Sequence, residues 1–212
     1  FLKTAPQVNA GFVIDVVAMT FGRPYVLLPA VAAHVIGGGA VTVGVITAAG
    51  AVGSFALSVF SGRVRHVRRQ GLVIGRSVEL YGVFVLLFGL VILVMQTGWF
   101  GHPGSDFSQV NWAALIVGAV AFAAMGATDE VSAIFRSSMM LTIVPDEMRG
   151  RLQGVFFAIV TGGPRLGDIY AGFLAGLTVL WFPPVLGGIL VALIVAITLR
   201  MTPALRNYRV GE

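Results

Sequence analysis

The sequence contains no cysteine and few charged residues, and each shortage excludes a class of function. Without cysteine, the chain can form no disulfide, no thiolate metal site and no cysteine nucleophile. Its three histidines fall in separate predicted loops or helix ends, so we expect no metal site and no cofactor. Charged residues make up 11% of the chain, whereas soluble domains carry about 25%.

Hydrophobic residues are in excess, at 57% of the chain with a mean hydropathy of +0.93. A soluble domain could not remove so much apolar surface from water, so we expect an integral membrane protein. The net charge is +5, but the arginines stand in short clusters between apolar runs without interleaved aromatic residues. Nucleic acid is therefore not an expected partner.

Six apolar stretches are long enough to cross a bilayer as helices, because about 20 residues span the hydrocarbon core. Glycine-rich or polar segments separate them. We therefore predict one all-α domain over residues 1–212, a six-helix transmembrane bundle. The expected helices cover residues 10–33, 40–61, 72–97, 112–135, 152–177 and 184–201.

The basic residues of the connecting segments all fall on one side of this arrangement. They flank the second and fourth loops, precede the first helix and follow the last, while the other three loops lack Lys and Arg. The positive-inside rule makes this side cytoplasmic, with both ends of the segment there. Candidate residues of a cytoplasmic gate or its loops are Gly62, Arg63, Arg68, Arg69, Arg76, Arg136, Pro145, Asp146, Arg149, Gly150 and Arg151.

Several ionisable residues fall inside the predicted helices, where each costs at least about 2.5–3.5 kcal/mol unless it meets a partner or water. We expect Asp15, the first candidate for a proton carrier, and Asp129 near the cytoplasmic side. Arg23, Arg165 and Asp168 are expected to share a deeper level, with Asp168 paired either to Arg23 or to Arg165. Static pairing and interfacial placement remain alternatives to a transport role. The candidate substrate and proton pathway comprises Asp15, Arg23, Asp129, Glu130, Arg165 and Asp168.

Two helix interruptions are expected near these charges. Gly162, Gly163 and Pro164 fall midway along the fifth helix, and Pro24 follows Arg23 in the first. Proline removes a backbone donor, and broken helices at membrane depth are tolerated where they line a cavity. A packing kink without function is the alternative interpretation.

Four ordered stretches suggest a family. Residues 14–24 (IDVVAMTFGRP) resemble the seventh helix of major facilitator superfamily carriers in the branch of the enterobactin (siderophore) exporter. Residues 128–136 (TDEVSAIFR) resemble the tenth helix of that branch, residues 144–151 (VPDEMRGR) its following loop, and residues 162–168 (GGPRLGD) its eleventh helix. Residues 61–69 keep the glycine and arginines of the superfamily's loop motif but lack its acid.

The resemblance implies the C-terminal half, helices seven to twelve, of a twelve-helix carrier. The chain begins with Phe1 and has no signal peptide, so we interpret it as part of a longer protein whose N-terminal half would complete the substrate cavity. The implied activity is alternating-access efflux of a siderophore or other small amphipathic compound, coupled to protons. The alternative is a non-catalytic channel or scaffold subunit. An intramembrane serine protease does not fit, because Phe55 follows Gly53-Ser54 where that motif needs glycine.

Overall fold

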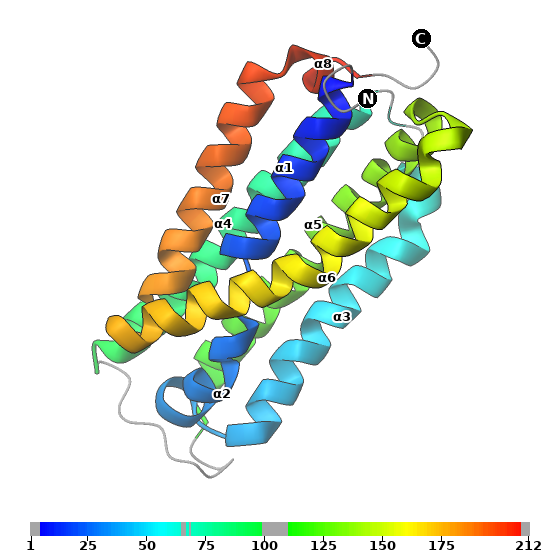
Figure 1. Cartoon of the computed structure of the whole chain (residues 1–212). Helices are drawn as coiled ribbons and strands as arrows, with labels where there is room; N and C mark the ends of the chain where they lie inside the picture. Colours follow the sequence, from blue (N-terminus) through cyan, green and yellow to red (C-terminus); the bar gives the residue numbers. More distant parts are fainter. Residues whose placement is uncertain (1–4, 65–66, 68, 99–109, 209–212) are drawn as a thin grey trace.

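The structure is a computed structural model that describes residues 5–64, 67, 69–98 and 110–208. All regular structure in these residues is helical, and the long helices run antiparallel in a bundle (Figure 1). The first helical segment is broken into four pieces: α1 (Pro6–Phe21), η1 (Tyr25–Leu27), α2 (Leu28–Val31) and η2 (Ala32–Ile36). The others are α3 (Gly39–Val64), α4 (Gln70–Gln96), α5 (Trp112–Ile143), α6 (Asp146–Leu177), α7 (Phe182–Met201) and the short α8 (Pro203–Arg206).

Five helical segments of the described chain are long and apolar enough to cross a membrane. They are Pro6–Ile36, Gly39–Phe60, Gln70–Gln96, Trp112–Ile143 and Phe182–Met201. The fifth predicted span, which is α6, has sufficient length at 32 residues but does not qualify. It carries six acidic and basic residues, whereas none of the five qualifying segments carries more than three. The chain is thus an all-helical, multi-pass membrane protein by length and composition.

The connection between α5 and α6 differs from the prediction. A loop was expected over residues 137–151, but α5 continues to Ile143 and α6 begins at Asp146, which leaves Val144 and Pro145 between them. Residues 136–143 contain neither glycine nor proline, so nothing ends the helix where the apolar run ends. Pro145 then forces the turn, because the residue before a proline avoids helical backbone angles.

Close helix approaches at glycines hold the bundle together. Helix α4 packs against α5 and α7, α3 packs against α5, and α1 packs mainly against α6 and α7. Gly53 of α3 lies against the backbone of Ala123, and Gly126 of α5 lies against that of Gly50, so neither position has room for a side chain. Such small-residue contacts replace the hydrophobic effect as the source of helix association in lipid.

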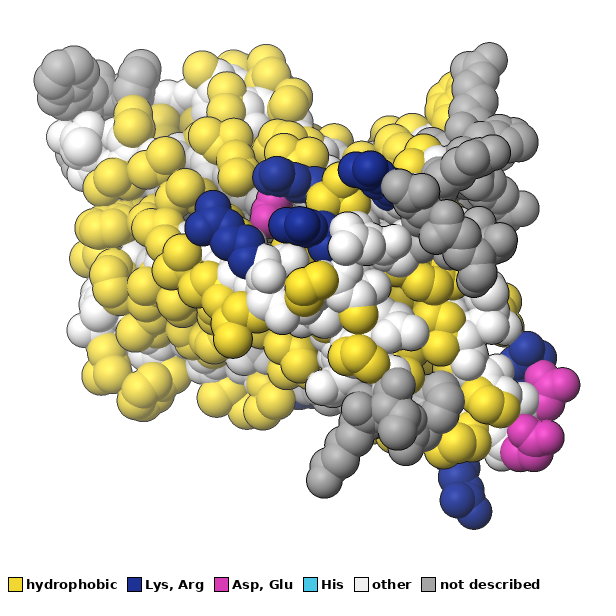
Figure 2. Space-filling model, turned by 90° about the horizontal axis from the view of Figure 1, so that it is seen from above, with side chains coloured by type: hydrophobic (Ala, Val, Ile, Leu, Met, Phe, Trp, Pro, Cys, Tyr) yellow, Lys and Arg dark blue, Asp and Glu magenta, His cyan; other side chains and the backbone are white. Residues whose placement is uncertain are grey.

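The two ends of the bundle differ in charge. The start of α1, the end of α3, the start of α4, the α5–α6 connection and α8 lie at one end (Figure 1). Figure 2 looks onto this end and shows basic and acidic side chains gathered within a largely hydrophobic outline. Exposed arginines of these elements are Arg69, Arg76, Arg149, Arg151, Arg200 and Arg206. Arg63 belongs to α3, whereas the predicted gate residue Arg68 lies outside the described residues.

Candidate functional site: two charge levels between the first and fourth spans

Helices α1 and α5 each present a charged stripe toward the interior of the bundle. On the first segment, Asp15 and Arg23 are eight residues apart; on α5, Asp129 and Arg136 are seven apart. The spacing on α5 is close to two helical turns, which keeps Asp129 and Arg136 on one face. Arg23 lies beyond the end of α1 at Phe21, so the break in the first segment and not helical periodicity sets its direction. Because α1 and α5 run in opposite directions, the acid of one helix lies at the level of the base of the other.

Nearer the charged end of the bundle, Asp15 and Arg136 form an ion pair. Arg136 Nη1 lies 2.5 Å from Asp15 Oδ1, and the two side chains are only 7% and 1% exposed. Asp15 Oδ2 and Arg136 Nε lack hydrogen-bond partners among the described residues. The pair is therefore sealed in the protein, with Val8, Phe12 and Phe156 around it. Removing one partner would strand an uncompensated charge.

Deeper in the bundle, the charged residues of the second level line a cavity and form no ion pair among the described residues. Arg23 and Asp129 both border a cavity of about 230 Å³ between the first segment, α3, α4 and α5. Among the described residues neither side chain is within ion-pair distance of a charge partner. The Arg23 guanidinium instead lies over the Tyr25 ring, 4.9 Å from its centroid. The remaining lining residues are Met19, Thr47, Gly50, Ala51, Ser54, Tyr81, Met125 and Gly126.

Two hydroxyl groups in this cavity are oriented by backbone carbonyls. The Ser54 hydroxyl donates to Gly126 O at 2.9 Å, and the buried Tyr81 hydroxyl donates to Gly22 O at 2.7 Å. With their protons engaged, both oxygens offer only lone pairs to anything else in the cavity. The Tyr81 bond also ties α4 to the end of α1.

The break in the first segment positions Arg23. Helix α1 ends at Phe21, and the chain continues through Gly22, Arg23 and Pro24 before η1 begins at Tyr25. Pro24 and Gly22 are buried, and Arg23 is half-buried. The interruption expected near Pro24 is therefore present, and it turns the Arg23 side chain toward the cavity instead of leaving it on a regular helix.

The end predicted for the fourth helix, at residue 135, was wrong. Because α5 extends to Ile143, Asp129 lies at about the middle of this helix and not near its cytoplasmic end. Its neighbour Glu130 is half-buried and does not line the cavity. The extra turns also carry Arg136 away from the end of its helix, which allows it to meet Asp15.

The α6 residues depart from two expectations. The helix is continuous through Gly162, Gly163 and Pro164, so no break occurs there; one lost backbone bond does not end a helix that neighbouring groups support. Gly163 and Gly167 lie against Met19 of α1, as close packing requires. Arg165 is exposed and Asp168 half-buried, and neither takes part in an ion pair among the described residues. The proposed pairings of Asp168 with Arg23 or Arg165 are thus not formed.

The predicted gate residues at the charged end form two local pairs. Arg76 Nη1 lies 2.8 Å from Glu79 Oε2, and Arg149 Nη1 lies 2.7 Å from Asp146 Oδ1. Arg149 Nη2 also donates to Leu141 O at 2.9 Å, which braces the α5–α6 turn. Pro145 precedes α6, Gly150 and Arg151 lie in its first turns, and Gly62 lies exposed in α3. These contacts stabilise helix ends, and exposed pairs contribute little.

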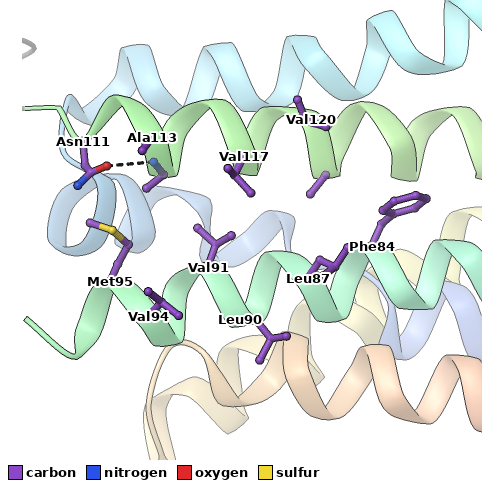
Figure 3. Close-up of a pocket in the computed structure, with 12 residues that line it drawn as sticks. Phe84, Leu87, Leu90, Val91, Val94, Met95, Asn111, Ala113, Val117 and Val120 are labelled. Carbon is purple, nitrogen blue, oxygen red and sulfur yellow. Dashed lines mark hydrogen bonds between the residues drawn. The ribbon is translucent and has the colours of Figure 1, made fainter. Parts of the chain in front are cut away.

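A second hollow has a different character. A groove of about 380 Å³ between α4 and α5 has a hydrocarbon lining that includes Phe84, Leu87 and Leu90. Figure 3 shows Val91 of α4 and Val117 of α5 pointing into the space between the two helices. Asn111 stands at one end and accepts a hydrogen bond from Ala114 N at 3.0 Å. Without a titratable group, this groove offers no chemistry beyond apolar contact, so the Arg23–Asp129 cavity is the candidate site.

No protein-family model, curated protein or solved structure matches the chain. Sequence reasoning selected Arg23 and Asp129 but missed their cavity partners Tyr25, Ser54 and Tyr81, and it did not pair Asp15 with Arg136. On both segments the acidic residue precedes the basic one, and the two segments run in opposite directions, so the acid of one lies beside the base of the other. This order in the sequence could have predicted the pair of Asp15 with Arg136.

Proposed function

We propose that the chain is the six-helix half of a secondary transporter, with the Arg23–Asp129 cavity on its transport pathway. In this proposal α6 completes a six-span bundle in the cytoplasmic membrane, and a second six-helix half of the same protein packs against it. The resemblance to siderophore-exporter-like major facilitator carriers suggests proton-coupled efflux of a siderophore or another small amphipathic compound.

The exposed face of α6 is the observation that carries the proposal. The helix is long enough to cross a membrane, yet Arg165 is exposed and Asp168 half-exposed near its middle. A charge facing hydrocarbon at that depth costs at least about 2.5–3.5 kcal/mol. This face therefore needs protein or water beside it, and a partner bundle enclosing an aqueous cavity supplies both.

The burial of the charges supports different roles for the two carboxylates. Asp15 is sealed in a pair with Arg136, whereas Asp129 borders the cavity. A group that exchanges protons or contacts substrate must be reached from water, so we assign that role to Asp129. Asp15 instead holds α1 to α5, and Asp129 replaces it as the first candidate for a proton carrier.

Accumulation of a fluorescent amphipathic dye in cells that express the complete protein tests this function. We expect the intact protein to lower dye accumulation and Asp129→Asn to abolish that effect, while Glu79→Gln, in an exposed pair at the bundle end, leaves it unchanged. Collapse of the proton gradient should likewise abolish the lowering of dye accumulation by the intact protein. Equal accumulation with and without the protein would favour the alternative, a channel or scaffold subunit whose α6 face is covered by another copy.

A further inference from the structure

The Arg23–Asp129 cavity presents one positive and one negative side chain, and within the described chain neither has an ion-pair partner. We propose that it binds a small zwitterion, whose anionic group lies against Arg23 and whose ammonium group lies against Asp129. The proposal rests on the proposed function, because it names the substrate class of the same site.

Charge balance favours a zwitterion over a simple ion. Arg23 and Asp129 together add no net charge to the cavity. A purely anionic ligand would neutralise Arg23 but face the Asp129 carboxylate, and a purely cationic one would face the guanidinium. A ligand that carries both charges satisfies each side chain and brings no uncompensated charge into the low-dielectric interior.

The hydrogen-bonding groups of the cavity are also of two kinds, donors at Arg23 and acceptors at Asp129, Ser54 and Tyr81. Arg23 has only N–H donors, and its Nε has no hydrogen-bond partner among the described residues. Ser54 and Tyr81 already donate to Gly126 O and Gly22 O, so their oxygens can only accept. Arg23 therefore matches a ligand carboxylate or phosphate, while Asp129 and the two hydroxyl oxygens match N–H donors.

Size and wall composition limit the ligand further. At about 230 Å³, the cavity is smaller than the roughly 300–1,000 Å³ typical of drug-sized ligands. Met19, Ala51 and Met125 supply apolar wall between the charged groups. A compound of amino-acid size with a short apolar body fits both features.

Binding of three probes that share an isobutyl group tests the proposal. L-leucine carries both charges, isocaproate only the carboxylate and isoamylamine only the ammonium. We expect calorimetry on the purified protein in lipid nanodiscs to give L-leucine at least about tenfold tighter binding than either single ion, since each lost charge pair is worth more than 1.4 kcal/mol. Asp129→Asn should reduce leucine binding to the level of isocaproate, and Arg23→Gln to that of isoamylamine.

Matched controls separate charge from folding. Glu79→Gln and Arg200→Gln make the same chemical changes at the charged end of the bundle and should leave leucine binding intact. Arg23→Lys keeps the cation and should retain the preference for a zwitterion. Absence of leucine binding, or equal binding of all three probes, would overturn the proposal. Because binding is measured without transport, Asp129-dependent dye efflux combined with absent leucine binding would reject the zwitterion and keep the transporter.

Discussion

At the scale of single residues, we expect the buried ion pair of Asp15 with Arg136 to tolerate substitution least. Both side chains are more than nine-tenths buried, and each offers the other its charge compensation. A buried pair of this kind contributes little net stability compared with a hydrophobic replacement, but it makes each partner intolerant of losing the other. We expect the pair to fix the register of α1 against α5.

We expect Asp15→Asn and Arg136→Gln each to destabilise the protein by about 3–5 kcal/mol, because each strands a buried charge. The double variant should be less damaged than the sum of the two single variants. Thermal unfolding of the four proteins in detergent measures this difference. Additive losses would show that the two groups do not interact.

The sequence predicted part of this site. Hydropathy made Asp15, Arg23 and Asp129 conspicuous, since ionisable groups are rare inside membrane spans. It could not reveal which charges meet, because pairing depends on the relative direction and offset of helices far apart in sequence. Asp168 was expected to pair on grounds of depth. Arg23 Cβ does lie near Gly167 of α6, but the Arg23 guanidinium lies over the Tyr25 ring and forms no ion pair with Asp168.

At the scale of helices, packing depends on which glycines lie in interfaces. Gly126 of α5 lies against the Gly50 carbonyl of α3, whereas a methyl group added at Gly172 of α6 would meet no atom within 4 Å. Gly126→Ala should therefore lower stability by about 1–3 kcal/mol through overpacking. Gly172→Ala should be neutral or stabilising by up to about 1 kcal/mol through helix propensity. The melting temperatures of the two variants in detergent compare these effects. Equal shifts would contradict the close packing of Gly126 against Gly50.

Helix α6 allows a direct test of what covers its outer face. The chain has no cysteine, so a single-cysteine variant introduces the one thiol within residues 1–212. Thr161 lies one turn before Arg165 and is exposed, whereas Val83 of α4 and Leu193 of α7 are exposed on apolar helices.

If water reaches the α6 face, Thr161→Cys should react with a membrane-impermeant maleimide at least about tenfold faster than Val83→Cys or Leu193→Cys, because the reactive thiolate forms only in water. Mass spectrometry of the labelled complete protein in membranes gives the rates. Equal, slow labelling at all three positions would place the α6 face in lipid or in a dry interface, and would remove the aqueous pathway from the proposal.

The helix boundaries show why the elements were only partly predictable. Apolar runs locate the part of a helix that lies in hydrocarbon, and those predictions coincide with the observed helices. They do not locate helix ends, because polar residues such as Ser137 and Thr142 continue α5 as readily as apolar ones. The break expected at Pro164 was wrong for a related reason: proline weakens a helix locally, and the contacts of Gly163 and Gly167 with α1 keep α6 continuous.

At the scale of the whole molecule, the antiparallel arrangement collects nearly all exposed basic residues at one end of the bundle. This end includes the start of α1, the end of α3, the start of α4, the α5–α6 connection and α8. The opposite end carries the turn at Gly37 and Gly38, whose positive φ values of 88° and 76° suit glycine. Charge asymmetry of this kind orients multi-pass proteins with the basic end in the cytoplasm.

Orientation can be measured with one cysteine at each end. Thr97 follows α4 at the end without basic residues, and Asn207 follows α8 at the basic end; both are exposed. In intact cells, an impermeant maleimide should label Thr97→Cys of the complete protein, whereas Asn207→Cys should react only after the membrane is permeabilised. Labelling of Asn207→Cys from outside would show that the bundle has the opposite orientation in the membrane. The Arg23–Asp129 cavity would keep its chemistry, but the direction assigned to transport would lose its support.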